Sequence, residues 1–312
     1  MRLFRLLALM LIVAVPAAVR AEVEAGDIPG QADWYLHADL AAMRAVPSGH
    51  ALYAWLNDEV FADVKQEIGI DIGAEVDSVT AFADEALGAV LLVEGPISQQ
   101  TRDKLLALAT LKAKLDTGSY DGKTWYHVQR GEHRKRGKRS LEAFDDSAWF
   151  TFEVEDKLIV TSTQEQLEAL LDSGGRLAGT GSHAGSLFVL TADKEFVQAG
   201  ARTAELADDD TDWNSNILRN TEKVALLVSD RDGLVAVEAQ LVSKDPTITR
   251  SLGGIINGLV SLQAFNEDID PAVRTIIQNT KIEVLDNVLS IDMVFDPAIV
   301  VRVLDERHAG TQ

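Results

Sequence analysis

The chain has 312 residues, of which 46% are apolar and none is cysteine, and its 49 aspartates and glutamates outnumber 29 lysines and arginines to give a net charge of −20 at pH 7. The lack of cysteine excludes disulfides, thiolate metal sites and a cysteine nucleophile within these residues. The negative charge disfavours nucleic acid and bare anionic lipid as main partners, and the apolar fraction is typical of a packed globular protein.

Residues 1–21 have the pattern of a secretory signal peptide. Arg2 and Arg5 precede an apolar run from Leu6 to Val15, and small residues lead to a cleavage position before Glu22. The run is about half as long as the ~20 apolar residues that a transmembrane helix needs. We therefore expect an exported protein with no transmembrane anchor after cleavage, located in the periplasm of a Gram-negative bacterium or secreted.

The first elements expected after the signal are a strand and a hairpin. The strand Leu36–Asp39 ends in an aspartate that precedes a helical stretch. Val79–Phe82 and Gly88–Val93 are short apolar runs of strand length, which predict the hairpin. Ser98 has the position and the residue type of an N-cap, so a helix is expected to begin there.

The next strand is predicted from Tyr120–Tyr126, which contains three aromatic residues after a turn. A turn followed by a half-buried strand, with Trp125 in the core or on the sheet face, accounts for the pattern. An aromatic platform for a carbohydrate or a peptide is the alternative.

Positive charge is concentrated in one segment of this acidic chain. We call residues 130–147 the basic hairpin, because they lie between strands predicted at Thr124–Val128 and Trp149–Val154. Its candidate partner-binding residues are Arg130, Arg134, Lys135, Arg136, Lys138 and Arg139. Such clusters bind phosphates and carboxylates, so the expected partner is an acidic envelope protein or polymer. A solvated or protease-sensitive loop is the alternative.

The first half of the chain closes with another hairpin and a helix. Glu153–Asp156 is expected to precede the second strand of that hairpin, and Thr163–Gln166 has the pattern of a capping box. A run rich in glycine, serine and threonine follows, which predicts a linker at residues 176–184.

The second half repeats this order of elements. Leu190–Asp193 matches the first strand, and Val224–Leu227 with Gly233–Glu238 matches the first hairpin. Asp230–Gly233 has the turn chemistry of a hairpin. Asp245 with Pro246 marks a helix start.

An acidic segment lies within this second half. Asp208, Asp210 and Asp212 place carboxylates at alternate positions, as a calcium loop does. That loop also needs glycine at its sixth position and glutamate at its twelfth, where this chain has Trp213 and Arg219. A solvated acidic loop is therefore expected, with these three aspartates as weak calcium candidates.

Leu252–Leu262 is the most apolar stretch after the signal, and Asn257 and three glycines interrupt it. It predicts a buried helix, in which Gly254 and Gly258 allow close packing on a sheet. Glu283–Asp286 then matches the third hairpin of the first half, and Asp296 with Pro297 matches the helix start that follows it.

Three blocks that recur in one order predict an internal duplication. The expected fold is α+β, with two tandem copies of a small unit whose mostly antiparallel sheet is covered by helices on one face. The first copy spans residues 22–175 and includes the basic hairpin, and the second spans residues 185–312.

Known catalytic and metal-binding patterns are absent from the sequence. Asp39 and Asp193 stand at equivalent places between a strand and a helix, where N-capping is the simplest role. The six histidines show no HxH, HxxxH or HExxH spacing, so we expect no cofactor and no metal.

The chain resembles a loose group of exported bacterial proteins that have no settled activity. The resemblance rests on the signal peptide, the strand that ends in an Ala-Asp step, the Tyr-x-Gly-x-x-aromatic-Tyr strand at Tyr120–Tyr126 and the duplicated body. It implies the α+β fold and export, and it assigns no active site.

These observations favour a non-catalytic envelope protein that binds a protein or a polyanionic partner. A periplasmic hydrolase with carboxylates between the two copies is the first alternative, since convergent active sites leave no linear signature. A carrier of a small apolar ligand, which would need a pocket of roughly 300 Å³ or more, is the second.

Overall fold

The computed structural model describes residues 32–84, 88–129, 147–176, 186–197, 219–264, 271–299 and 301–302. The chain divides into two compact units. Unit 1 contains Ala42–Trp55 and the described part of His183–Gln312, and unit 2 contains strand β1 and the described part of Leu56–Ser182. A short segment of the first half therefore belongs with the second half.

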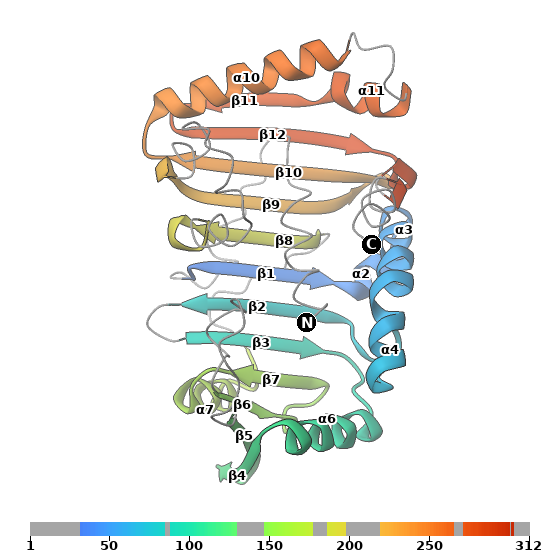
Figure 1. Ribbon diagram of the computed structural model, residues 1–312, viewed down its shortest axis with the longest axis vertical. Coiled ribbons are helices and arrows are strands. Elements are labelled where there is room, and N and C mark those ends of the chain that lie inside the picture. Colours follow the sequence, from blue (N-terminus) through green and yellow to red (C-terminus); the bar gives the residue numbers. More distant parts are fainter. Residues whose placement is uncertain are drawn as a thin grey trace. The chain divides into compact units, whose positions relative to one another are not determined.

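The described part of unit 2 contains seven antiparallel strands with the hydrogen-bonded order β1-β2-β3-β7-β6-β5-β4 (Figure 1). The strands are β1 (Trp34–Asp39), β2 (Ser78–Asp84), β3 (Gly88–Glu94), β4 (Lys114–Tyr120), β5 (Lys123–Gln129), β6 (Ser147–Thr151) and β7 (Lys157–Thr161). A two-residue turn, Asp121–Gly122, joins β4 to β5, and the positive φ of both residues is the geometry that such a tight hairpin turn requires.

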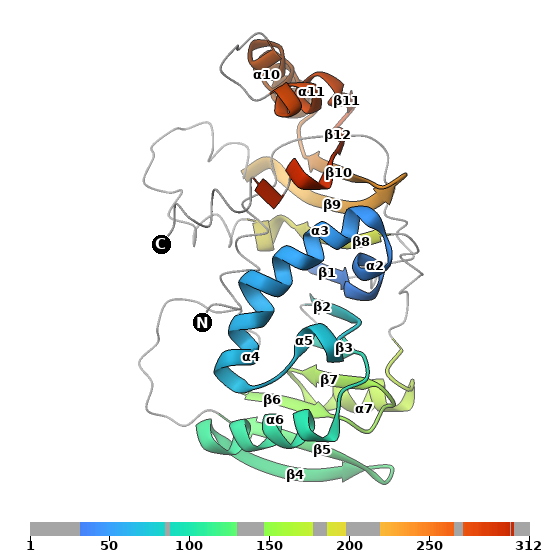
Figure 2. The same cartoon turned by 90° about the vertical axis from the view of Figure 1, so that its right-hand side faces the viewer.

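The helices described in unit 2 are the π-helical η2 (Asn57–Phe61), α4 (Ala62–Ile68), α5 (Ile72–Glu75), α6 (Gln99–Lys112) and α7 (Gln164–Asp172). Three of them, α5, α6 and α7, begin after residues whose side chains cap them. The hydroxyl of Ser98 accepts from the amide of Thr101, and that of Thr163 accepts from the amide of Gln166. Both predicted N-caps are therefore confirmed. Helix α6 lies beside β4, and α7 packs on β7 (Figure 2).

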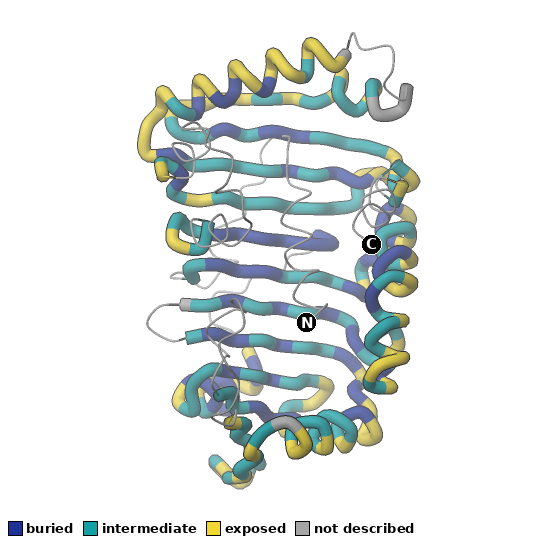
Figure 3. The backbone as a smooth tube through the Cα atoms, viewed as in Figure 1, coloured by how far each residue is buried: buried dark blue, intermediate teal, exposed yellow. Residues whose placement is uncertain are grey.

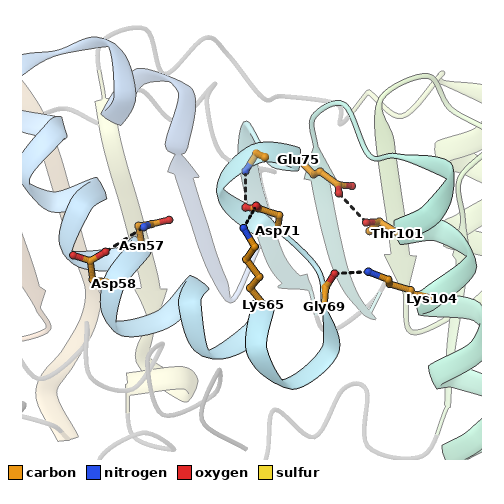
Figure 4. A network of polar contacts seen from close by, with 9 residues as sticks. Asn57, Asp58, Lys65, Gly69, Asp71, Glu75, Thr101 and Lys104 are labelled. Atoms are coloured by element: carbon orange, nitrogen blue, oxygen red, sulfur yellow. Dashed lines mark hydrogen bonds and ion pairs between the residues drawn. The ribbon is translucent and has the colours of Figure 1, made fainter.

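Polar contacts join helix α6 to the segment Gly69–Glu75, which follows α4 within unit 2 (Figure 4). Lys104 Nζ donates to the carbonyl of Gly69 at 2.5 Å, and Thr101 Oγ1 donates to Glu75 Oε1 at 2.9 Å. Asp71 also accepts from the amide of Ala74 at 3.2 Å, which caps α5. These contacts satisfy hydrogen-bonding groups at the end of α4 and in α5, and they fix the course of the loop between these two helices.

Among its described residues, unit 1 has five antiparallel strands in the order β11-β12-β10-β9-β8 (Figure 1). Its elements are α3 (Pro47–Leu56), most of α2 (Leu40–Ala45), β8 (Ser186–Asp193), β9 (Thr221–Arg231), β10 (Leu234–Ser243), α10 (Pro246–Ala264), α11 (Pro271–Asn279), β11 (Lys281–Leu285) and β12 (Val288–Phe295). Asp232 and Gly233 have φ of 56° and 83°, which confirms the predicted β9–β10 turn.

Helix α10 packs on one face of the sheet of unit 1 through a small apolar core. Leu252 and Ile256 of the helix are buried with Leu289 and Ile291 of β12. A Cβ at Gly253 would lie 2.4 Å from Val284 Cγ2, so the helix and β11 approach too closely there for any other residue. Gly254 and Gly258 have no atom within 4 Å of such a Cβ, which shows that the predicted role of these two glycines was wrong.

The predicted α+β fold with antiparallel strands is confirmed. Both units also share an order of pairing, because β1-β2-β3-β7-β6 of unit 2 corresponds to β8-β9-β10-β12-β11 of unit 1. This correspondence supports the duplication, which stays a prediction. The β4–β5 hairpin of unit 2 stands in the chain where unit 1 has α11. Among the residues that the structure describes, no helix is both long and apolar enough to cross a bilayer.

Candidate functional site

The candidate residues of the basic hairpin, from Arg130 to Arg139, lie outside the described residues. The structure does describe the two strands on either side of them. Gln129 of β5 and Ser147 of β6 are antiparallel partners, so the two described strands that flank this segment in the sequence are neighbours in the sheet. The assignment of these arginines and lysines to a partner contact remains a prediction.

The weak calcium candidates Asp208, Asp210 and Asp212 also fall outside the described part of the chain. Within the part that is described, no three side chains among histidine, aspartate and glutamate lie close enough to hold a metal ion.

The paired aspartates occupy the ends of equivalent strands, Asp39 in β1 and Asp193 in β8. Asp193 Oδ1 accepts from the amide of Phe196 at 3.1 Å, which is the contact of an N-cap. Its carboxylate is therefore engaged at a helix start, as the sequence predicted.

Three described histidines have separate surroundings. His37 Nδ1 lies 2.9 Å from Thr80 Oγ1, and His50 Nε2 contacts the carbonyl of Arg44. His127 stacks on Trp149 of the neighbouring strand with ring centroids 3.9 Å apart. Each imidazole thus has a local structural contact.

The aromatic residues of β5 take part in cross-strand packing. The indole of Trp125 covers Gly118 of β4, where a Cβ would lie only 2.2 Å from Trp125 Cζ2. Glycine at this position therefore makes room for the ring, and the ring shields the glycine backbone. Burial lowers the pKa of the neighbouring His127, with Asp116 opposing and Lys114 adding to this effect. These contacts account for Trp125 as a packed side chain.

Two buried carboxylates meet on the sheet of unit 1. Glu238 of β10 and Asp292 of β12 are directly opposite each other, and both are buried. Arg231 donates to Glu238 Oε1 at 2.7 Å and to Asp292 Oδ1 at 3.4 Å. Burial is the main reason that the pKa of Glu238 lies above its ordinary value; Arg231 opposes this effect and Asp292 adds to it. The guanidinium spans both acids, which offsets the repulsion between them.

The outward side of α10 exposes large aliphatic residues. Ile255 is 40% exposed, Leu259 is 53% exposed and Leu262 is 71% exposed. They follow one another at spacings of four and three residues, so they form a continuous stripe along the helix. Figure 3 shows the exposed outward turns of α10 and its buried sheet-facing turns.

Small and uncharged residues complete this side of the helix. We call the α10 surface the set of exposed residues Ser251, Gly254, Ile255, Gly258, Leu259, Ser261 and Leu262. No residue from Ser251 to Gln263 is charged, although the chain as a whole carries −20. Large contiguous patches of exposed apolar residues mark sites that contact another protein, a membrane or a ligand.

The sequence predicts a buried helix at Leu252–Leu262, and the structure buries only one side of it. The sequence contains a sign of this exposed side, because Leu252–Leu262 has apolar residues on all sides of the helix and no charged residue that would face solvent. Such a helix is either enclosed by its own protein or completed by a partner.

No known family model matches the chain, and no curated protein matches it significantly. Solved structures that it resembles include three crystal forms of the protein TP0453. Crystal form IV has a TM-score of 0.47 at 11% identity over 94% of this chain and 98% of that chain. Form III gives 0.45 at 11% over 94% and 99%, and form I gives 0.43 at 12% over 95% and 98%.

Proposed function

We propose that the protein is a non-catalytic binding protein of the cell envelope that engages a protein partner through the α10 surface. The observation that carries the proposal is the exposure of Ile255, Leu259 and Leu262 on one uncharged helix side. The location rests on the signal peptide expected at residues 1–21.

The energetics of these side chains favour an interface. Full burial of one large aliphatic side chain stabilises a complex by about 1.5–3 kcal/mol before the costs of association. On the free protein, Leu259 and Leu262 contribute little of this to folding, because more than half of each is exposed. Their hydrophobic contribution is thus available to a binding partner.

The chemistry of the surface also indicates the kind of partner. Charged residues are depleted at the centres of protein interfaces, and the α10 surface carries none. An apolar helix side with small residues fits the apolar side of another helix, which is a recurring mode of recognition. The basic hairpin would supply a second, electrostatic contact.

The proposal is tested with glutamate substitutions on the mature chain. Leu259→Glu and Leu262→Glu should leave the free energy of unfolding within about 0.5 kcal/mol of the wild type, because both sites are exposed. They should also remove the partner mass that native mass spectrometry detects on protein purified gently from the periplasm.

Leu111→Glu is the matched control, since Leu111 is 82% exposed on α6 of unit 2. This variant should keep the partner. Strong destabilisation by the α10 variants would show that these leucines belong to the fold, and an unchanged complex would show that binding occurs elsewhere. Either result contradicts the proposal.

A further inference from the structure

We infer that the partner of the α10 surface is a second copy of this chain, bound through an antiparallel pair of α10 helices that is centred on Gly258. The inference rests on the proposed function, because it names the occupant of the same surface. It follows from the pattern of large and small residues along one side of the helix.

Gly258 lies at the middle of the exposed side. Each residue of an α-helix is rotated by about 100° from the last, so Gly258 lies about 200° around the axis from Ile256. Ile256 is buried against the sheet, and Leu252 and Thr249 are buried on the same side of the helix. Gly258 therefore points away from the sheet, and nothing lies within 4 Å of the position of a Cβ there.

The surface is complementary to itself around this point. Gly254 and Leu262 are each four residues, or about 6 Å along the axis, from Gly258. In an antiparallel pair centred on Gly258, Leu262 of one copy lies at the height of Gly254 of the other, and Ile255 lies at the height of Ser261. Large side chains thus meet small residues, and a two-fold axis makes every such contact twice.

The free space at the two glycines is what this packing requires. Neither Gly254 nor Gly258 has a neighbour within 4 Å of a Cβ position, unlike Gly253, which faces Val284. Small residues at a spacing of four let two helix backbones approach closely, so that the flanking leucines interdigitate.

The absence of charge also favours the α10 surface as the place where two identical acidic molecules come into contact. Two copies of a chain with a charge of −20 repel each other wherever acidic surfaces meet. The α10 surface brings no charged residue between Ser251 and Gln263 to the contact. One helix pair buries less than the roughly 1,200–2,000 Å² of a standard complex, so the dissociation constant should fall roughly between micromolar and millimolar.

The register is tested by disulfide crosslinking, which the cysteine-free chain makes specific. Gly254→Cys and Leu262→Cys variants of the mature protein are mixed and oxidised. The mixed disulfide should form about tenfold faster than a disulfide between two Leu111→Cys molecules, the exposed control on α6. Disulfides between identical variants should be slow, since those positions lie about 12 Å apart along the axis.

Equal rates for all combinations would overturn the inference. A second measurement uses no substitution: sedimentation velocity of the wild-type mature chain should show a dimer that grows with concentration up to about 1 mM, consistent with the expected affinity. A monomer throughout would also overturn it.

The failure of this inference is distinguishable from the failure of the proposed function. If the purified chain stays monomeric while native mass spectrometry shows a different protein bound and Leu259→Glu releases it, the partner is heterologous and only the inference falls. If both experiments show a bare monomer, both fall.

Discussion

Neighbouring glycines of α10 have opposite surroundings, although the sequence makes them look alike. Gly253 faces Val284 of β11, and Gly254 faces open space. Helical periodicity did not separate them, because apolar residues occur on all sides of this helix and so do not fix which side faces the sheet. The packing of α10 on β11 and β12 determines which side of the helix faces the sheet.

Alanine substitutions test this difference directly. Gly254→Ala should stabilise the fold by up to about 1 kcal/mol, because alanine is the better helix former and the site is open. Gly253→Ala should destabilise it by about 1–3 kcal/mol, because its Cβ would overlap Val284. Urea unfolding of dilute protein measures both. Equal effects would contradict the described packing.

The carboxylate of Glu238 gives a second test at this scale. Because its folded pKa is raised above its unfolded value of 4.5, the folded protein binds the proton more tightly than the unfolded chain. This contribution to stability is present below pH 4.5 and is lost as the pH rises through the folded pKa. The unfolding free energy of the wild type, measured relative to that of Glu238→Gln, should therefore fall as the pH rises above 4.5. A difference that rises with pH would show that Arg231 outweighs burial.

Local signals predicted many individual elements. The hairpin at Asp232–Gly233 and the helix starts at Ser98 and Thr163 depend on neighbouring residues alone, so their chemistry is visible in the sequence. The packing of segments that lie far apart in the sequence cannot be inferred from neighbouring residues in this way. Nothing in the sequence indicated that Ala42–Trp55 would pack with the second half of the chain.

A hydrogen bond connects the segment Ala42–Trp55 to strand β9 of unit 1. Ser48 is fully buried in α3, and its hydroxyl donates to Asp230 Oδ2 at the end of β9. This bond is the main reason that the pKa of Asp230 lies below 3.8, against the effect of burial. Strand β9 is far from Ser48 in sequence, so the contact could not be inferred from either segment.

Ser48→Ala tests the attachment of α3 through its pH dependence. A lowered pKa of Asp230 contributes stability above pH 3.8 that is lost as the pH falls through the folded value. The variant should be less stable than the wild type at neutral pH, and the difference should shrink below pH 3.8. Ser261→Ala, whose hydroxyl donates to the carbonyl of Asn257, is the control and should show no such change. A pH-independent difference at Ser48 would argue against the contact.

At the scale of the molecule, net charge and the apolar surface act in opposite directions on association. A charge of −20 opposes contact between copies, whereas the proposed contact through the α10 surface brings no charged residue from Ser251 to Gln263 to the interface. The location of this surface could not be predicted, because it depends on which side of α10 the sheet covers. The predicted basic hairpin would behave differently, since its contacts are electrostatic.

The dependence on salt concentration distinguishes apolar contacts through the α10 surface from electrostatic contacts through the basic hairpin. Raising NaCl from about 0.02 M to about 0.5 M shortens the Debye length from about 20 Å to about 4 Å and screens the repulsion between acidic copies. Self-association through the α10 surface should therefore strengthen with salt, as sedimentation velocity would show. Binding of a polyanion through the basic hairpin should weaken over the same range, so weaker self-association at high salt would assign it to charged residues instead.

The proposed partner-binding role of the α10 surface is tested most directly by photo-crosslinking in cells that produce the protein. A photoreactive residue at Leu259 should give a crosslinked product of defined mass, because this side chain would lie inside the interface. The same residue at Leu111, which is exposed on α6, should give none. Products of equal yield at both positions, or no product at Leu259, would contradict the account.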